Sequence, residues 1–452
     1  MTAYLARIDR LNPSHNAIVS RPDSDDLVAS AVLADKELDQ GCYRGWLHGI
    51  PHAVKDLADA KGLETSQGSR IFAGTTAEND DLFVSRIRAA GAIFIGKTNT
   101  PEFGLGSQSY NDVHGTTLNA YDNHLTAGGS SGGAAVGLAT HMLPVADGSD
   151  MMGSLRNPAG FNNVIGFRPS QGRVPEHPRD DPYYQQLAVA GPMGRNVEDA
   201  IRLLQTIAGP DSRDPMSRRD SVPAREQFAP ARLDGYRIGW MGDYNGYLAT
   251  EPGIMPLCEH TLKALGHHGA IVEHCTPEYD MARLWRTWLT LRHWTLGSKK
   301  NLYDNAQHRP LLKPEVVWEI EGSFAQTAAE IRCAGVARAD WYRSLLALFD
   351  QYDILALPTA QVFPFDATVH WPQAINGKRM DTYHRWMEVT IGGTLAGLPV
   401  VNLPAGFNDM GVPMGMQFIG RSGEDQKVLE FALAYESVTD FLDRRPPPLP
   451  EG

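Results

Sequence analysis

The spacing of apolar residues predicts alternating helices and strands in the first part of the chain. Apolar side chains recur at three- and four-residue steps over residues 1–11, a helix that Asn12-Pro13 is expected to end. The same spacing predicts a second helix over residues 26–38. A short continuous apolar run over residues 50–54 is typical of a buried strand.

Helices alternate with strands again further along the chain. Residues 80–90 predict a helix capped by Asn79 or Asp80, and residues 92–95 predict a strand after an intervening glycine. A similar unit recurs over residues 197–208. The pattern favours an α/β fold, with a large mixed β-sheet, mostly parallel in its centre, sandwiched between helices.

The loops and the C-terminal part complete this picture. Residues 101–130 are polar and lack periodicity, which is typical of long ordered loops that carry function. A small apolar helix is expected over residues 133–140, a brief strand over 143–146 and an exposed connection over 209–235. After the most helical part, residues 276–350, strand-like runs return the chain to the sheet at residues 354–357, 399–403 and 414–419.

A stripe of large apolar side chains at helical spacing lies within residues 284–294 and includes Trp285 and Trp288. Two interpretations of this stripe stay open. Its rings can pack against the core of the protein, or some of them can line an apolar substrate pocket.

Composition and charge narrow the class of protein. The 452 residues are 42% apolar and carry a net charge of −12, which disfavours nucleic acid or an anionic membrane surface as a partner. No run approaches the about 20 apolar residues of a membrane span. The four cysteines are widely spaced and form no CxxC pair, as expected for free thiols in a reducing compartment. We therefore expect a cytoplasmic protein, and a homodimer stays open.

Three polar segments carry the candidate chemistry. Residues 49–56 read Gly-Ile-Pro-His-Ala-Val-Lys-Asp, residues 128–133 read Gly-Gly-Ser-Ser-Gly-Gly, and residues 148–156 read Gly-Ser-Asp-Met-Met-Gly-Ser-Leu-Arg. Glycines surround Ser130 and Ser154, so backbone N–H groups can approach the partners of their hydroxyls. A hydroxyl nucleophile needs a base and donors for the oxyanion it creates. The three segments could supply all of these.

Each segment alone has other interpretations. The glycine-rich segment 128–133 could be a phosphate-binding turn, although it lacks the Gly-Lys-Ser/Thr ending of a P-loop. Gly129, Ser131 and Gly133 match Gly-x-Ser-x-Gly, but residues 119–127 are not the strand that an α/β-hydrolase elbow requires. The sequence has no HExxH motif and no clustered Cys/His set, so a metal site has little support.

Lys55 is the candidate base. Apolar residues flank it on both sides, and burial lowers the pKa of a lysine by disfavouring its charged form. A solvated ion pair with Asp56 is the other interpretation of Lys55. Lys97 is a competing candidate for the base on the same grounds.

Together, the three segments resemble the amidase signature family, through Gly-Ile-Pro-x-x-x-Lys-Asp, Gly-Gly-Ser-Ser-Gly-Gly and Gly-Ser-Asp-x-x-Gly-Ser-x-Arg-x-Pro-Ala. The resemblance covers nearly the whole chain and continues through residues 166–170, 172–174, 395–399 and 413–417. It implies the amidase signature fold in a single domain over residues 1–452. The family core then spans about 1–205 and 346–440, around a variable helical segment of about 206–345.

The resemblance also implies a Ser–cis-Ser–Lys triad. By motif, the nucleophile is Ser154, the bridging serine on a cis peptide bond is Ser130, and the base is Lys55. Ser131 matches a supporting donor, and family positions that hold the nucleophile loop in shape match Asp150 and Arg156.

The implied reaction needs no cofactor, because these side chains supply both base and nucleophile. Neutral Lys55 takes a proton from Ser130, which takes one from Ser154 as this serine attacks the substrate carbonyl. Ser130 then protonates the leaving amine, and water resolves the acyl-enzyme. The oxyanion hole is expected from the N–H groups of Met151, Met152, Gly153 and Ser154.

One position departs from the family pattern. Relatives usually have two glycines before the nucleophile, and Met152 fills the first of these places. If that residue needs a positive φ, a methionine there is strained; otherwise the loop avoids that conformation. The expected substrate pocket includes Gly128, Gly129, Leu105, Trp285 and Trp288.

The sequence therefore predicts hydrolysis of a carboxamide or a related C–N bond, including a carbamate, with an ester side activity left open. Leu105, Trp285, Trp288 and Met152 favour an apolar or aryl small-molecule substrate. One alternative is the amidase-type subunit of a tRNA-dependent amidotransferase, which the net charge of −12 disfavours. A further alternative is a non-enzymatic module that binds an anion at the glycine-rich loop.

Overall fold

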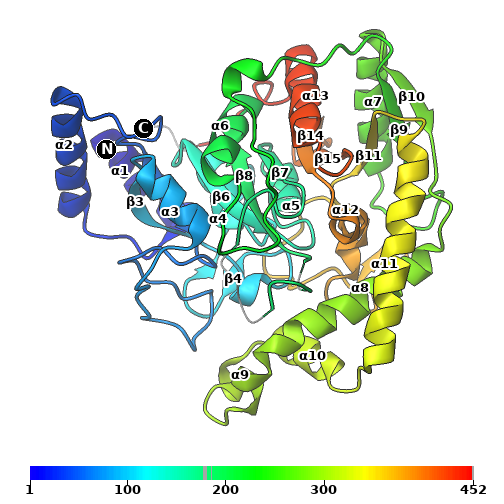
Figure 1. Ribbon diagram of the computed structural model, residues 1–452, viewed down its shortest axis with the longest axis horizontal. Coiled ribbons are helices and arrows are strands. Elements are labelled where there is room, and N and C mark those ends of the chain that lie inside the picture. The colour runs from blue at the N-terminus through cyan, green and yellow to red at the C-terminus, as the bar shows by residue number, and fades with distance from the viewer. Residues whose placement is uncertain (177–180, 185, 450–452) are drawn as a thin grey trace.

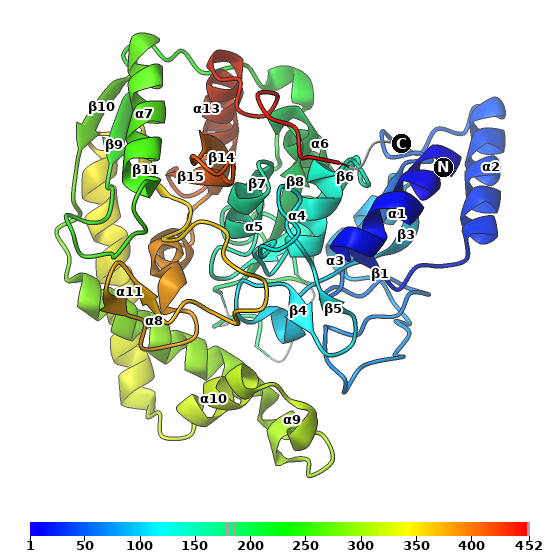
Figure 2. The same cartoon turned by 180° about the vertical axis from the view of Figure 1, so that it is seen from behind.

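Helices enclose two separate β-sheets in the computed structural model, which describes residues 1–176, 181–184 and 186–449 (Figures 1 and 2). The N-terminal helices lie on one side of the molecule, and the long helices of the middle of the chain lie on the other (Figure 1). The helices are α1 (Thr2–His15), α2 (Ser24–Asp39), α3 (Leu82–Ala89), α4 (Gly132–Ala139), α5 (Arg156–Phe161), α6 (Val197–Ile207), α7 (Ile254–His267), α8 (Met281–Leu296), α9 (Lys300–Asp304), α10 (Pro314–Ser323), α11 (Ala328–Phe349), α12 (Ile391–Ala396) and α13 (Asp425–Val438).

The large sheet has eight strands in the order β10-β9-β11-β15-β14-β7-β8-β6. Its strands are β6 (Val145–Asp150), β7 (Ile165–Arg168), β8 (Val189–Gly194), β9 (Arg237–Trp240), β10 (Ile271–His274), β11 (Ile354–Pro358), β14 (Val400–Phe407) and β15 (Pro413–Ile419). The mixed sheet between helices is confirmed, and so are the expected C-terminal strands.

The prediction of a mostly parallel centre is wrong. Only β10, β9 and β11 pair in parallel, at one edge of the sheet, and the other neighbours are antiparallel. Parallel neighbours need crossover connections, which α7 and α8–α11 provide at that edge. In the centre, a short turn joins β14 directly to β15, and such a hairpin forces antiparallel pairing.

A second, three-stranded sheet carries the first helix–strand unit. Its order is β1-β3-β2, with β1 (Ile18–Val19), β2 (Pro51–Lys55) and β3 (Ile93–Thr98). Helix α3 crosses from β2 to β3, which pair in parallel. The predicted unit is therefore present, but in its own sheet. The unit does not recur after α6, because the next strand, β9, begins only at Arg237.

Two predicted helix ends differ from the structure. Helix α1 continues through Pro13, because the proline lies in the last turn, and it ends where Asn16 adopts a left-handed conformation with φ of 51°. Helix α3 begins after Asp81. Asp80, a predicted cap, instead accepts a hydrogen bond from the backbone N–H of Lys61 and pairs with Arg88.

The segment predicted as most helical contains α8, α9, α10 and α11, with α8 packed against both α10 and α11. Short strand pairs complete the described structure: β4 (Tyr110–Asn111) with β5 (Gly115–Thr116), and β12 (Ala374–Ile375) with β13 (Lys378–Arg379). Among the described residues, no helix combines the length and the apolar character needed to cross a bilayer.

Candidate active site

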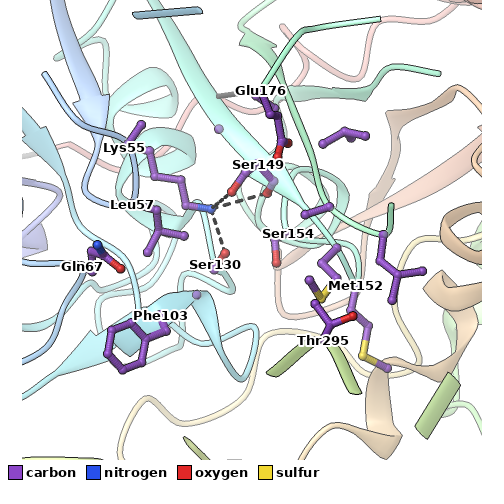
Figure 3. Close-up of a pocket in the computed structure, with 18 of the residues that line it drawn as sticks. Lys55, Leu57, Gln67, Phe103, Ser130, Ser149, Met152, Ser154, Glu176 and Thr295 are labelled. Atoms are coloured by element: carbon purple, nitrogen blue, oxygen red, sulfur yellow. Dashed lines mark hydrogen bonds between the residues drawn. The ribbon is translucent and has the colours of Figure 1, made fainter. Parts of the chain in front are cut away.

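Lys55 ends strand β2 with its side chain buried at the floor of a cavity (Figure 3). Its Nζ donates to the hydroxyls of Ser130 at 2.7 Å, Ser131 at 2.8 Å and Ser149 at 3.0 Å. Burial lowers the pKa of Lys55 to about 7, although the charges of Asp147 and Asp150 oppose this shift. A large fraction of the amine is therefore neutral near pH 7 and can accept a proton.

The loop before α4 presents Ser130 to this amine. The Gly129–Ser130 peptide bond is cis, and Gly128 has a φ of +71°. A Cβ on Gly128 would lie 2.5 Å from Oδ1 of Asn157, and a Cβ on Gly129 would lie 2.8 Å from the backbone N of Gln108. Neither glycine lines the cavity, contrary to the prediction. Their role is to let the loop pack closely enough to place the two serines.

Ser154 lies in the turn between the end of β6 and the start of α5. The hydroxyls of Ser130 and Ser154 face the same cavity (Figure 3). Among the described residues, these two hydroxyls form no hydrogen bond with each other. The backbone N–H of Ser131 donates to the carbonyl oxygen of Ser154 at 3.2 Å, which joins the two serine loops directly.

The turn that carries Ser154 places its one left-handed residue at Gly153, with φ of +80°. A Cβ there would lie 2.7 Å from Cγ2 of Thr390. Met152 has no positive φ, so the loop avoids the strain considered for it, and its buried side chain lines the cavity.

One of the four expected oxyanion donors is already engaged. The N–H of Gly153 donates to Oδ1 of Asp150 at 3.0 Å, because the left-handed turn points this group back toward the strand. Within the described parts of the chain, the N–H groups of Met151, Met152 and Ser154 meet no protein acceptor. These three donors remain available to a ligand.

A buried ion pair fixes this turn to the large sheet. Arg156 donates to both carboxylate oxygens of Asp150, at 2.9 Å each, and also to Oε1 of Gln417 at 2.7 Å. Burial would raise the pKa of Asp150, but Arg156 and Arg168 hold it well below its usual range. Arg168 and Gln417 lie in segments that match the family, but neither residue was predicted to have a role.

A second buried pair joins the two sheets behind Lys55. Nε2 of His52, on β2, lies 2.8 Å from Oδ1 of Asp147, on β6. Oδ2 of Asp147 accepts the backbone N–H of Lys55 at 3.2 Å. His52, Asp147 and Ser149 were not predicted as site residues. The available signal for His52 was a polar residue inside the strand predicted over residues 50–54, whereas Asp147 and Ser149 lie beyond the strand predicted over residues 143–146.

Lys97 is also buried but does not meet the serines. Its Nζ donates to the carbonyl oxygen of Ala58 and to Oγ1 of Thr65, at 3.1 Å for the latter. Burial lowers its pKa, and the nearby charge of Asp56 opposes that shift. Of the two candidate bases, only Lys55 contacts serine hydroxyls in the described structure.

A cavity of about 430 Å³ opens over Ser130 and Ser154. Leu105 lines it, as predicted. Trp285 and Trp288 do not: both are buried, with their rings 5.2 and 6.4 Å from that of His384. Their interpretation as a stripe packed on the core is therefore the one that the structure supports.

Helix α8 still contributes to the cavity, through Arg292, Thr295 and Leu296, which were not predicted as lining residues. The lining residues include, besides Ser130, Ser154 and Lys55, Leu57, Gln67, Phe72, Phe103, Met151, Met152, Arg292, Thr295 and Leu296.

No group of three or more His, Cys, Asp or Glu side chains suited to a metal ion occurs in the described ranges.

Comparisons with known proteins match nearly the whole chain. A family model described as Amidase matches residues 1–429. The chain is 30% identical to an acylamidase of Rhodococcus erythropolis, over 98% of this chain and 92% of that protein. It is 34% identical to a Glutamyl-tRNA(Gln) amidotransferase subunit from Symbiobacterium thermophilum, over 99% of this chain and 94% of that protein. The crystal structure of a bacterial aryl acylamidase superposes with a TM-score of 0.90 at 27% identity, covering 98% of this chain and 94% of that chain.

Proposed function

Since the chain belongs to the amidase family, we propose that it hydrolyses a carboxamide of an apolar or aryl amine through an acyl-enzyme on Ser154. The observation that carries this proposal is the buried Nζ of Lys55, 2.7 Å from Oγ of Ser130 and with a pKa of about 7. A buried amine that is partly neutral and touches a serine has the properties of a general base.

The proposed reaction begins when Lys55 accepts a proton from Ser130, which accepts one from Ser154. The oxygen of Ser154 then attacks the substrate carbonyl. The free N–H groups of Met151, Met152 and Ser154 stabilise the resulting oxyanion, and the loss of one such donor typically costs roughly 3 kcal/mol. Ser130 returns a proton to the departing amine, and water releases the acid.

The direction of proton transfer defines the two sides of the cavity. The departing amine lies next to Ser130, so the acyl group extends the opposite way. Figure 3 shows Leu57 and Phe103 on the Lys55 and Ser130 side. Phe72 also lines the cavity, with its ring edge-on to that of Phe103 at 6.1 Å. These apolar groups support an aryl amine as the leaving group.

The test is a hydrolysis screen of primary amides, anilides, aryl carbamates and esters, run with the parent protein and with Ser154→Ala. We expect the highest kcat/KM for anilides or aryl carbamates, and no turnover by the variant. Turnover of small polar amides alone would contradict the aryl preference. Labelling of the parent by a fluorophosphonate, abolished in Ser154→Ala, separates an enzyme from an anion-binding module, because only an activated serine reacts.

The 34% identity to an amidotransferase component supports a second candidate, in which the chain works as part of such a complex. The net charge of −12 gives no support for tRNA contact. Anilide turnover by the purified chain alone favours the first candidate. Glutamine hydrolysis that requires partner proteins, without anilide turnover, favours the second.

A further inference from the structure

Arg292, on helix α8, is a buried cation at the wall of the cavity. Its side chain is 4% exposed, and the residue lines the cavity together with Thr295 of the same helix. Two of its nitrogens have oxygen partners. Nε donates to Oε1 of Glu319, and Nη2 donates to the hydroxyl of Tyr383 at 2.8 Å.

The third nitrogen, Nη1, lacks such a partner. Its one acceptor among the described residues is Sδ of Met151, at 3.4 Å. A thioether sulfur is a weak acceptor, whereas a guanidinium is a strong, permanently charged donor. Hydrogen bonds from charged groups are the most costly to leave unmade in a buried site. The cavity therefore presents a strong donor that an oxygen of a bound molecule can satisfy.

The contacts of Arg292 place this donor on the acyl side. Met151 belongs to the turn that carries Ser154, and Thr295 lies one helical turn after Arg292. Figure 3 shows Thr295 and Met152 on the Ser154 side of the cavity, away from Phe103. Because the amine departs on the Ser130 side, a group that reaches Nη1 belongs to the acyl half of the substrate.

The charges around Arg292 favour a neutral oxygen over a carboxylate as the group that binds Nη1. Burial alone would raise the pKa of Glu319, but Arg292 holds it well below the usual range, so Glu319 remains a carboxylate. The hydroxyl of Tyr383 also donates to Glu319, at 2.6 Å. The positive charge of Arg292 is thus already balanced. A second carboxylate would be buried beside Glu319, whereas a neutral oxygen gains the hydrogen bond without that repulsion.

We propose that Nη1 of Arg292 forms an acyl-side subsite for a neutral hydrogen-bond acceptor, an ether or carbonyl oxygen in the acyl chain of the substrate. The proposal rests on the proposed amide hydrolysis and adds the chemical class of the acyl group. It makes Arg292 a residue that determines specificity, separate from the groups that carry out proton transfer.

The test compares anilides that differ only by an ether oxygen in place of a methylene group. Methoxyacetanilide is paired with butyranilide, and methoxypropionanilide with pentananilide. We expect the parent protein to prefer the ether in at least one pair by about tenfold or more in kcat/KM, the effect of one hydrogen bond to a charged group. The anilide of succinic acid, which carries a carboxylate, should be a poorer substrate than either ether.

The variant Arg292→Met should reduce this preference to about twofold or less. The ratio within one preparation does not depend on the fraction of folded protein. Because Arg292→Met removes the guanidinium partner of the buried Glu319, the double variant Arg292→Met with Glu319→Gln is measured as well. Arg283→Met is the matched control, since Arg283 is on the same helix, half-exposed and paired with Asp340 at 2.8 Å. It should keep the preference of the parent.

Two results would overturn the subsite. In one, the parent hydrolyses ether and alkyl anilides equally well in both pairs, or prefers the carboxylate. In the other, the ether preference survives in the Arg292 variants. Both are distinct from failure of the proposed function, in which the parent hydrolyses no anilide at all.

Discussion

The two regions that form the cavity are built in different ways. On one side, the serine loops and strand β2 place Lys55, Ser130 and Ser154 through glycines, a cis peptide bond and buried ion pairs. On the other side, helix α8 places Arg292 and Thr295, and contacts with Glu319 and Tyr383 hold the Arg292 side chain. The first region is fixed by backbone conformation, and the second by which face of a helix meets its neighbours.

We infer from this difference that the first region carries out the proposed reaction and that the second determines which substrate is preferred. The catalytic loops tolerate little change, because a Cβ on Gly128, Gly129 or Gly153 would lie within 3 Å of a neighbouring atom. Side chains on the cavity face of α8 lie outside these glycine-containing turns, and Arg292 contacts the Ser154 turn through Sδ of Met151. We therefore expect substitutions in the loops to abolish turnover and substitutions on the helix to redirect it.

The largest expected effect is that of Ser154→Ala. Removal of the nucleophile should lower kcat by roughly 10⁴- to 10⁶-fold, as in other serine hydrolases. The measurement is anilide turnover with a parallel melting curve, since the variant should remain folded. Near-normal turnover of every parent substrate would place the nucleophile elsewhere.

The two buried lysines give the next contrast. Lys55→Met should lower kcat by roughly 10²- to 10⁴-fold, the usual contribution of a general base. Lys97→Met removes a buried donor to the carbonyl oxygen of Ala58 and to Thr65, and should instead cost roughly 1–3 kcal/mol of stability, measured by urea unfolding. Equal losses of activity per folded molecule in both variants would contradict the assignment of the base to Lys55.

Trp285, on α8, tests whether the apolar stripe within residues 284–294 packs against the core or lines the substrate pocket. Trp285→Ala should destabilise the protein by about 3–5 kcal/mol because it empties a packed site. The ether-to-alkyl ratio of kcat/KM should stay that of the parent. A changed ratio with an unchanged melting temperature would show that this ring contacts substrate after all.

The smallest expected effect is a shift of the pH profile. Activity should rise with pH through about 7 as Lys55 loses its proton, because burial lowers its pKa to that value. The carboxylate of Asp147 favours the charged amine, so Asp147→Asn should lower this pKa further. The acidic limb of kcat/KM should then move to lower pH by about one unit or less. Asp9→Asn, at an exposed position paired with Arg21, should leave the limb in place.

The same contrast explains what the sequence could predict. The serine loops need glycine at defined positions, so the sequence itself carries their signature. The motifs therefore predicted Lys55, Ser130 and Ser154 as one site. The structure shows Lys55 in contact with Ser130, and the catalytic roles stay predictions. Strands over residues 50–54, 354–357, 399–403 and 414–419 and most helices were also predicted, because each buries an apolar face or run, whereas β7, β8 and β10 of the large sheet were not predicted.

Tertiary contacts account for the rest. Periodicity shows that α8 has an apolar face, but it does not show that Trp285 points to the core and Arg292 to the cavity. The parallel centre was wrongly predicted because strand pairing depends on how distant segments meet. The pairing of His52 with Asp147, 95 residues apart, left no pattern in either segment.

That pair has a consequence for how reactivity is controlled. The predicted base and nucleophile come from two different sheets, and the contact between the His52 imidazole and the Asp147 carboxylate joins these sheets. A small displacement of one sheet relative to the other would lengthen the distance between Lys55 and Ser154 while both sheets stay intact. Substitutions that remove this contact altogether, unlike Asp147→Asn, which keeps a hydrogen-bonding group there, should therefore lower turnover before they lower the melting temperature.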